Sequence, residues 1–139
     1  MNTSLRVSQL ASEFHISPDT VRHYVRIGLL NPPKDDSGYH RFSAEDQKTL
    51  SFILSARDLG FSLEDIRTLL DDAGRGESPC PHARSLIEER LTDARRQLAS
   101  LQSLVERMEQ ATRQWRDQPD CEPCGDHICH LIEGVRHEH

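Results

Sequence analysis

The 139-residue sequence has few aromatic residues, 5% of the chain, and only 35% of its residues are hydrophobic. So small an apolar fraction does not supply a large globular core, whereas a charged fraction of 29% suits long solvated helices. A chain of this length has room for one modest domain, or for a small domain and an extended element. We therefore expect a small head and a long helix rather than one globule.

Segments that would direct the chain to a membrane or out of the cell are also lacking. The start, MNTSLRVSQLASEF, has no basic region followed by an apolar run, as a signal peptide would have. No apolar stretch approaches the roughly 20 residues that a membrane span needs. We expect a cytoplasmic protein with no membrane partner. In that compartment thiols stay reduced, and clustered cysteines serve metal or redox chemistry more often than disulfides.

Positive charge is in deficit over the whole chain but not in its first part. The net charge is −6, yet residues 1–42 hold five Lys or Arg against four Asp or Glu, a balance of +1 that leaves −7 for the rest. The field that a phosphate meets is local and short-ranged. The acidic total therefore does not exclude binding to nucleic acid.

The first 28 residues predict two short helices joined by a tight turn. Residues 4–13 place apolar side chains at helical spacing. Ser17 is a good N-cap, Pro18 a good first helical residue, and Gly28 a good stop for the second helix. Two short helices in this arrangement form a helix-turn-helix.

The next segment predicts a wing and two further helices. NPPKDDSGYHRF is rich in turn residues, so we expect a loop or small β-wing in which Tyr39 and Phe42 press on the helices. Ser43 and Ser62 each begin a helix, with an acidic residue three positions later. GRGESPCP then breaks the pattern. Residues 1–75 therefore predict a winged helix-turn-helix head.

Glycine and proline are absent between residues 83 and 116. Apolar-biased positions there recur in alternating steps of four and three, the heptad pattern of a coiled coil: Ile87, Leu91, Ala94, Leu98, Leu101, Val105, Met108, Thr112 and Trp115. One narrow stripe cannot bury itself, and the sequence offers no second long helix to cover it. We therefore expect residues 81–118 to form a dimerisation helix in a homodimer.

Three of the four cysteines lie in CEPCGDHICH, residues 121–130, within a Cys/His-rich loop and tail that covers residues 119–139. Thiolates and imidazoles together bind soft or borderline cations. The candidate ligands are Cys80, Cys121, Cys124, His127 and Cys129. His82, near Cys80, is expected to be solvated rather than to bind the metal. The terminal His137 and His139 are not expected to belong to the metal site.

Other uses of these cysteines remain open. An iron–sulfur cluster needs four ligands and the loop has only three cysteines, so that assignment would require His127 as a substitute. A structural zinc knuckle uses the same chemistry without sensing. A zinc enzyme would need an open coordination position and a general base in a pocket. A chain this thin offers little cavity, so we do not expect an enzyme.

The head resembles that of the MerR family of transcriptional regulators. The resemblance rests on VSQLASEFHISPDTVRHYVRIGLL and SGYHRFSAEDQKTLSFILSARDLGFSLEDIRTLL, and it continues through the long helix and the cysteine loop. It implies a mainly α fold: a winged helix-turn-helix head, a long helix in an antiparallel coiled coil, and a C-terminal metal-binding loop. It also implies a homodimer on double-stranded promoter DNA.

By position, the resemblance implies DNA-binding roles for Ser17, Thr20, Arg22, His23, Tyr24, Arg26, Gly38, Tyr39 and Arg41. The arginines suit charge-assisted bonds to phosphate or bidentate bonds to guanine. Two positions depart from the family pattern. Most members have an aromatic residue in place of His23 and a glutamate in place of Val25, which puts the details of those contacts in doubt.

The resemblance also orders the candidate metals. Metal-sensing members carry one cysteine where the long helix starts and a pair in the loop after it, and the antiparallel dimer brings the two together between subunits. Cys80, Cys121 and Cys129 match these positions. The copper(I) branch has serine at the first position, so Cys80 implies the divalent, zinc-responsive branch. Zn(II) leads, and Cd(II), Pb(II), Hg(II) and Cu(I) remain open.

The family mechanism then follows as an expectation. The metal-free dimer holds a promoter whose elements are out of phase for RNA polymerase. On metal binding the two heads shift, and the DNA bends and underwinds until the elements align. A regulator of this kind would activate a metal efflux or detoxification promoter.

Overall fold

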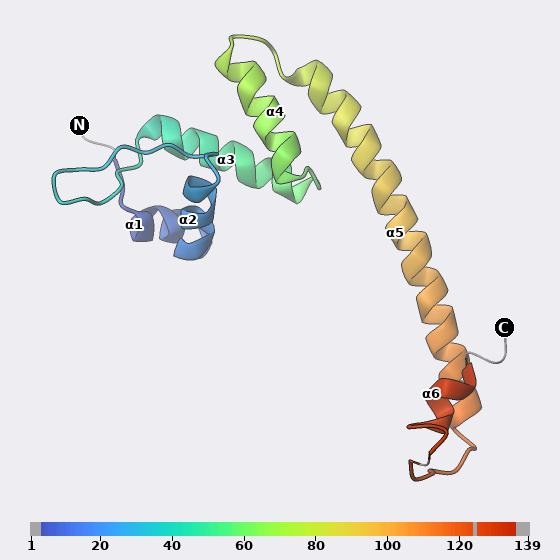
Figure 1. The fold of residues 1–139 in the computed structure, drawn as a ribbon. Coiled ribbons are helices and arrows are strands. Elements are labelled where there is room, and N and C mark those ends of the chain that lie inside the picture. The colour runs from blue at the N-terminus through green and yellow to red at the C-terminus, as the bar shows by residue number, and fades with distance from the viewer. Residues whose placement is uncertain (1–3, 124, 136–139) are drawn as a thin grey trace. The chain divides into compact units, whose positions relative to one another are not determined.

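The computed structural model describes residues 4–123 and 125–135, which are mainly helical (Figure 1). The helices are α1 Val7–Phe14, α2 Pro18–Arg26, α3 Ala44–Asp58, α4 Leu63–Gly74, α5 Cys80–Trp115 and α6 His130–Val135. No β-strand forms in these described ranges. The chain divides into two units, Met1–Arg90 and Leu91–His139, and each is described by itself. The predicted mainly α fold and the long helix are confirmed.

Side-chain caps fix where the helices of the head begin. The Ser17 hydroxyl accepts the Thr20 amide at 3.1 Å and so starts α2 at Pro18. Ser43 with Asp46, and Ser62 with Asp65, form reciprocal capping boxes at α3 and α4. The first helix begins later than the predicted range 4–13, because the Gln9 side chain accepts the Arg6 amide and makes Arg6 the N-cap.

The predicted wing is a loop closed by single bridges rather than a strand pair. Lys34 pairs with His40, and Leu5 pairs with Phe42. One oxygen of Asp35 accepts the amides of Ser37 and Tyr39, which shapes the loop as an Asx-type turn. Phe42 is fully buried, as the sequence indicated, but Tyr39 is 57% exposed, so the expectation that it presses on the helices is wrong.

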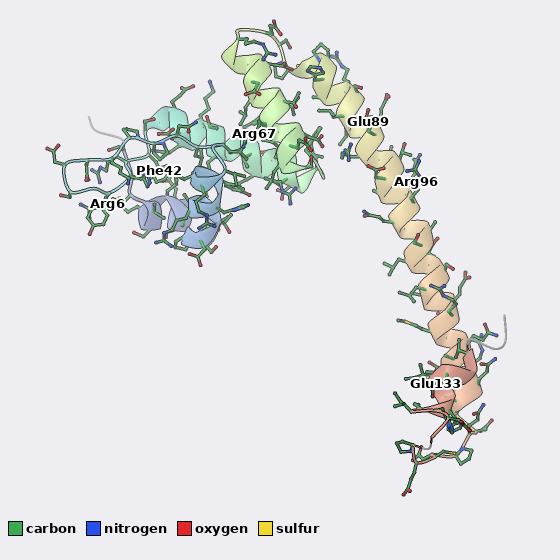
Figure 2. The ribbon with its side chains drawn as sticks, in the orientation of Figure 1. Arg6, Phe42, Arg67, Glu89, Arg96 and Glu133 are labelled. Atoms are coloured by element: carbon green, nitrogen blue, oxygen red, sulfur yellow. The ribbon has the colours of Figure 1, made fainter. Side chains whose placement is uncertain are left out.

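A single apolar core joins α1 to α4. Its fully buried members are Leu10, Val21, Leu30, Phe42, Leu50, Ile53 and Ile66. The guanidinium of Arg67, on α4 (labelled in Figure 2), donates to the carbonyl of Ile27, which follows the last residue of α2. Gly28 follows with φ +83°, a conformation that only glycine adopts without strain. The second helix is thus held at its end as well as along its buried face.

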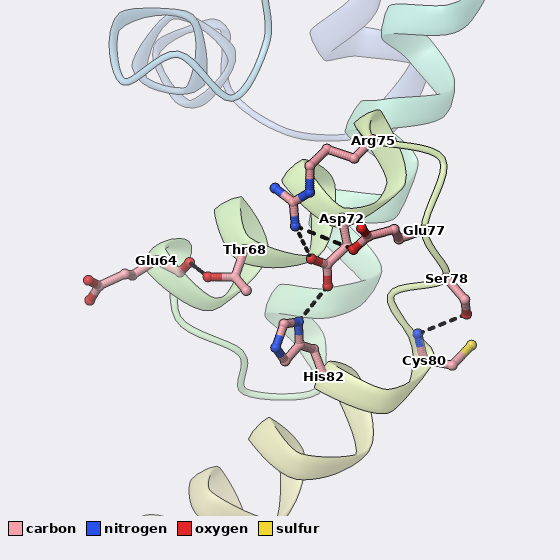
Figure 3. A network of polar contacts seen from close by, with 8 residues as sticks. All are labelled: Glu64, Thr68, Asp72, Arg75, Glu77, Ser78, Cys80 and His82. Atoms are coloured by element: carbon pink, nitrogen blue, oxygen red, sulfur yellow. Dashed lines mark hydrogen bonds and ion pairs between the residues drawn. The ribbon is translucent and has the colours of Figure 1, made fainter.

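Buried carboxylates tie the start of α5 to α4. Asp72 is only 3% exposed, and its two oxygens accept from Arg75 at 2.7 Å and from His82 Nδ1 at 2.5 Å (Figure 3). Two turns before Asp72 on α4, a carboxylate oxygen of Asp65 lies 3.3 Å from the Nε of Arg90. His82 was expected to be solvated, and its side chain is 58% exposed. The sequence did not predict that its Nδ1 also pairs with Asp72.

Beyond Arg90, α5 presents its apolar stripe to solvent. Leu91, Leu98, Leu101, Val105 and Met108 are all exposed, and no residue of α5 is buried. A leucine-rich seam left open in this way is what a coiled-coil partner covers. Among the described helices, none combines the length and the apolar composition that a membrane span requires.

The buried face of α3 supplies a matched test of the core. We expect Leu50→Ala, at a fully buried position, to lower the free energy of unfolding by about 2–5 kcal/mol, through lost transfer energy and a residual cavity. Leu59, at the end of the same helix, is 68% exposed, so Leu59→Ala should stay within about 0.5 kcal/mol. Urea unfolding followed by circular dichroism measures both. Equal losses would contradict this placement of the core.

Candidate functional site

The first candidate region is the exposed face of α2. Its N-terminal turn is ordered by Ser17 and Thr20, whose hydroxyl oxygens lie 2.9 Å apart. Arg22 pairs with Asp19 at 2.9 Å, and both side chains are largely exposed. The pair offers a guanidinium at the surface, which a phosphate can bind only in competition with Asp19.

A groove of about 610 Å³ runs between this face and the wing. Its walls are Arg6, Val7, Ser8, Arg22, Val25, Arg26, Gly38, Tyr39 and His40. Three of these residues are arginines, and no carboxylate lines the groove. The groove is therefore a local concentration of positive charge on a chain of net charge −6, the electrostatic footprint expected of a surface that contacts a phosphate backbone.

The predicted DNA-binding residues divide between this groove and other places. Arg22, Arg26, Gly38 and Tyr39 line it, whereas Ser17 and Thr20 cap α2. Tyr24 is only 6% exposed and belongs to the core, with its ring 6.0 Å from that of the half-buried His23. Arg41 is partly buried, with its Nε 3.9 Å from a carboxylate oxygen of Asp35.

Arg6 is a groove residue that the sequence interpretation missed. Its guanidinium carbon lies 4.9 Å from the centre of the exposed Tyr39 ring, in a cation–π contact that joins the wing to the start of α1. The available signal was an arginine directly before the first apolar-periodic residue. Arg6 lines the groove because the wing folds back over it, and the sequence pattern does not specify that arrangement.

The second candidate region begins at Cys80, the first residue of α5. Its thiol is exposed and free, and its amide donates to the Ser78 hydroxyl at 3.2 Å. The thiol points away from the Asp72–His82 pair (Figure 3). Cys80 thus lies at the surface. Asp72 holds the start of this helix in place through its contact with His82, two residues after Cys80.

The remaining candidate ligands follow the end of α5. Cys121 is an exposed free thiol, Cys129 a half-buried one, and the ring of His127 lies 6.2 Å from that of His130. Cys124 lies outside the described residues, as do His137 and His139 of the tail. Residues 119–139 were expected to be loop and tail, but the short helix α6 forms directly after Cys129.

In the described part of the chain, no three His, Cys, Asp or Glu side chains come together as a metal site. The donor types still fit a metal: three free thiols and an imidazole, at the two ends of one helix, are soft or borderline ligands. Two copies would have to combine their opposite ends to gather them into one site.

Comparison with known proteins places the chain among regulators. Residues 5–73 match the model described as MerR HTH family regulatory protein, and residues 47–111 match "MerR, DNA binding". The chain is 34% identical over 101 residues to the HTH-type transcriptional regulator ZntR of Escherichia coli K12, covering 71% of this chain and 72% of that protein. It is 31% identical over 104 residues to the mercuric resistance operon regulatory protein of Bacillus cereus, covering 74% and 78%.

A solved structure gives the same result. The chain resembles HiNmlR, a MerR family regulator lacking the sensor domain and bound to promoter DNA, with a TM-score of 0.57 and 26% identity. The similarity covers 82% of this chain and 87% of that one. Whether the groove of this chain binds DNA can be tested by measuring the affinity of groove variants for a DNA duplex.

We expect Arg6→Gln and Arg26→Gln each to weaken binding to duplex DNA and to reduce the slope of log affinity against log salt concentration by about 0.9, the effect of one lost phosphate contact. Fluorescence anisotropy on a duplex selected from a random library measures both quantities. Arg113→Gln, in the last turn of α5, is the control and should leave the slope unchanged. Unchanged slopes in both groove variants would exclude the groove as the interface.

Proposed function

The chain belongs to the MerR family of helix-turn-helix regulatory proteins, and on that premise we propose that it is a metal-responsive activator of transcription. The inducer is Zn(II) or a similar divalent ion. The target is a promoter for metal efflux or detoxification. The protein acts as a cytoplasmic homodimer on double-stranded promoter DNA, with RNA polymerase as its second partner.

One observation carries the proposal: free thiols stand at both ends of one long helix. Cys80 is the first residue of α5, and Cys121 and Cys129 follow its last residue. When two such helices pair in antiparallel fashion, the first residue of one lies beside the end of the other. A site made from Cys80 of one subunit and the loop of its partner then bridges the dimer, so its occupancy can change how the two subunits sit.

The exposed stripe on α5 supports the pairing. Leu91, Leu98 and Leu101 lie on the heptad stripe and face solvent in the single chain. Burying a leucine side chain contributes about 1.5–3 kcal/mol. A seam that repeats over several heptads therefore supplies a strong drive toward a two-stranded coiled coil.

The donor set favours a divalent ion. Cys80, Cys121, Cys124, His127 and Cys129 are five candidates for four positions, and a mixed sulfur and nitrogen set suits tetrahedral Zn(II), as well as Cd(II) and Pb(II). Hg(II) and Cu(I) can be held by fewer thiolates. A copper(I) site made by Cys121 and Cys129 alone is the main alternative, and it differs in making no use of Cys80.

Regulation then rests on two states of the dimer with different DNA contacts. Arg6, Arg22 and Arg26 hold phosphates in both states. The bound ion supplies a link between subunits. When the ion links the two subunits, the heads shift and the DNA bends and untwists. The altered contacts between protein and DNA offset the free energy of this deformation. The deformation brings the promoter elements into register for RNA polymerase.

The metal and the role of Cys80 can be tested together. We expect the reduced dimer to bind Zn(II) tightly under anaerobic conditions. Cys80→Ser should weaken that binding by at least about tenfold, because the site loses the one thiolate that the other subunit supplies. Competition with a chelator of known affinity measures the change, and a parallel Cu(I) titration is the comparison. Tight Cu(I) binding that is indifferent to Cys80→Ser, with weak Zn(II) binding, would replace the divalent site by the copper-type site.

Mixed dimers test whether each site spans two subunits. The Cys80→Ser and Cys129→Ser homodimers should both bind Zn(II) weakly, since every site lacks one ligand. Their heterodimer, purified through two different tags, should recover one tight site, because the intact Cys80 of one chain meets the intact loop of the other. A heterodimer of wild type with the double variant should have none. If that second heterodimer keeps one tight site, the ligands come from a single subunit.

A further inference from the structure

Two side chains of α6 hold the backbone on either side of the loop cysteines. One carboxylate oxygen of Glu133 accepts the amides of Ile128 and Cys129, each at 2.9 Å (Figure 2 labels Glu133). Both bonds converge on the same oxygen, so the carboxylate fixes the peptide units that lead into and out of Ile128. Hydrogen bonds to an ionised acceptor are stronger than neutral ones.

The second contact closes the loop at its base. His130 Nε2 lies 3.0 Å from the carbonyl oxygen of Pro119, eleven residues earlier. Because a carbonyl can only accept, Nε2 carries the proton and donates. Cys121 lies two residues after Pro119, and Cys129 directly precedes His130. The bond therefore brings together the two chain segments that carry the outer cysteines.

We propose that His130 and Glu133 form a clamp, here called the α6 clamp, that presets Cys121 and Cys129 for the metal before it arrives. The proposal rests on the proposed function, since it names the residues that position that site's ligands. Both are positioning residues and act through the backbone. A loop of ten residues that must order itself on binding loses affinity to conformational entropy, and closing it beforehand removes much of that cost.

The two contacts allow matched substitutions. Gln carries an amide N–H close to the place of Nε2, so His130→Gln keeps the donor to Pro119 but removes the imidazole, whereas His130→Ala removes both. Glu133→Ala removes the acceptor, and Glu133→Gln keeps a neutral one. Glu122, an exposed acid of the same loop, gives Glu122→Ala as a control of equal charge change.

The first readout needs no metal. In the metal-free protein, Glu133→Ala should speed hydrogen exchange at the amides of Ile128 and Cys129 by at least about tenfold, measured by NMR, while Glu122→Ala leaves both unchanged. Glu133→Gln should lie between wild type and Glu133→Ala. Unchanged exchange in Glu133→Ala would overturn the clamp, whatever the protein does with metals.

The second readout is Zn(II) affinity by chelator competition. Loss of a partner that orients a ligand typically costs 10–100-fold, and we expect His130→Ala and Glu133→Ala to fall in this range with the number of bound ions unchanged. His130→Gln should stay within about threefold of wild type. If His130→Gln loses as much as His130→Ala, His130 is itself a ligand and not part of a clamp. If wild type fails to bind any of the candidate ions, the proposed function fails, and the exchange experiment still decides whether the clamp exists.

Discussion

The start of the long helix depends on one buried group, the carboxylate of Asp72. A charge this far from water is costly unless it is paired and hydrogen-bonded. Arg75 and His82 meet that need, each from one side of the turn between α4 and α5. Because His82 is in the first turn of α5, satisfying Asp72 also determines where the long helix starts, and therefore where Cys80 stands on the head.

The groove shows how an acidic protein can present a cationic surface. Two of its basic groups are engaged within the chain: Arg22 pairs with Asp19, and Arg6 contacts the Tyr39 ring. These contacts are exposed and individually weak, which suits them to exchange for phosphate oxygens. Arg67 is used differently, since its bond to the Ile27 carbonyl fixes the end of α2. Arg67 does not line the groove, and its role is to hold the fold.

The described residues of the second unit, Leu91–His139, form no buried core of their own. No residue of α5 is buried, and only part of the loop that follows is covered. Polar contacts from His130 and Glu133 to backbone atoms help to order the loop. Such contacts hold a short segment in one conformation without apolar burial, and the Cys121 thiol stays exposed.

The sequence by itself determined the helices of the head, the long heptad helix and the two ends at which cysteines stand, because caps, glycine stops and apolar periodicity act over a few residues. Ser17, Ser43 and Ser62 cap as the pattern predicted, and Gly28 and Gly60 follow their helices. Only the tertiary structure decided which side chains became exposed or paired. The cation–π contact of Arg6 with Tyr39, the pairing of His82 with Asp72 and the burial of Tyr24 all involve residues that packing brings together. No local periodicity encodes such contacts, since their energy depends on neighbours supplied by other elements of the fold.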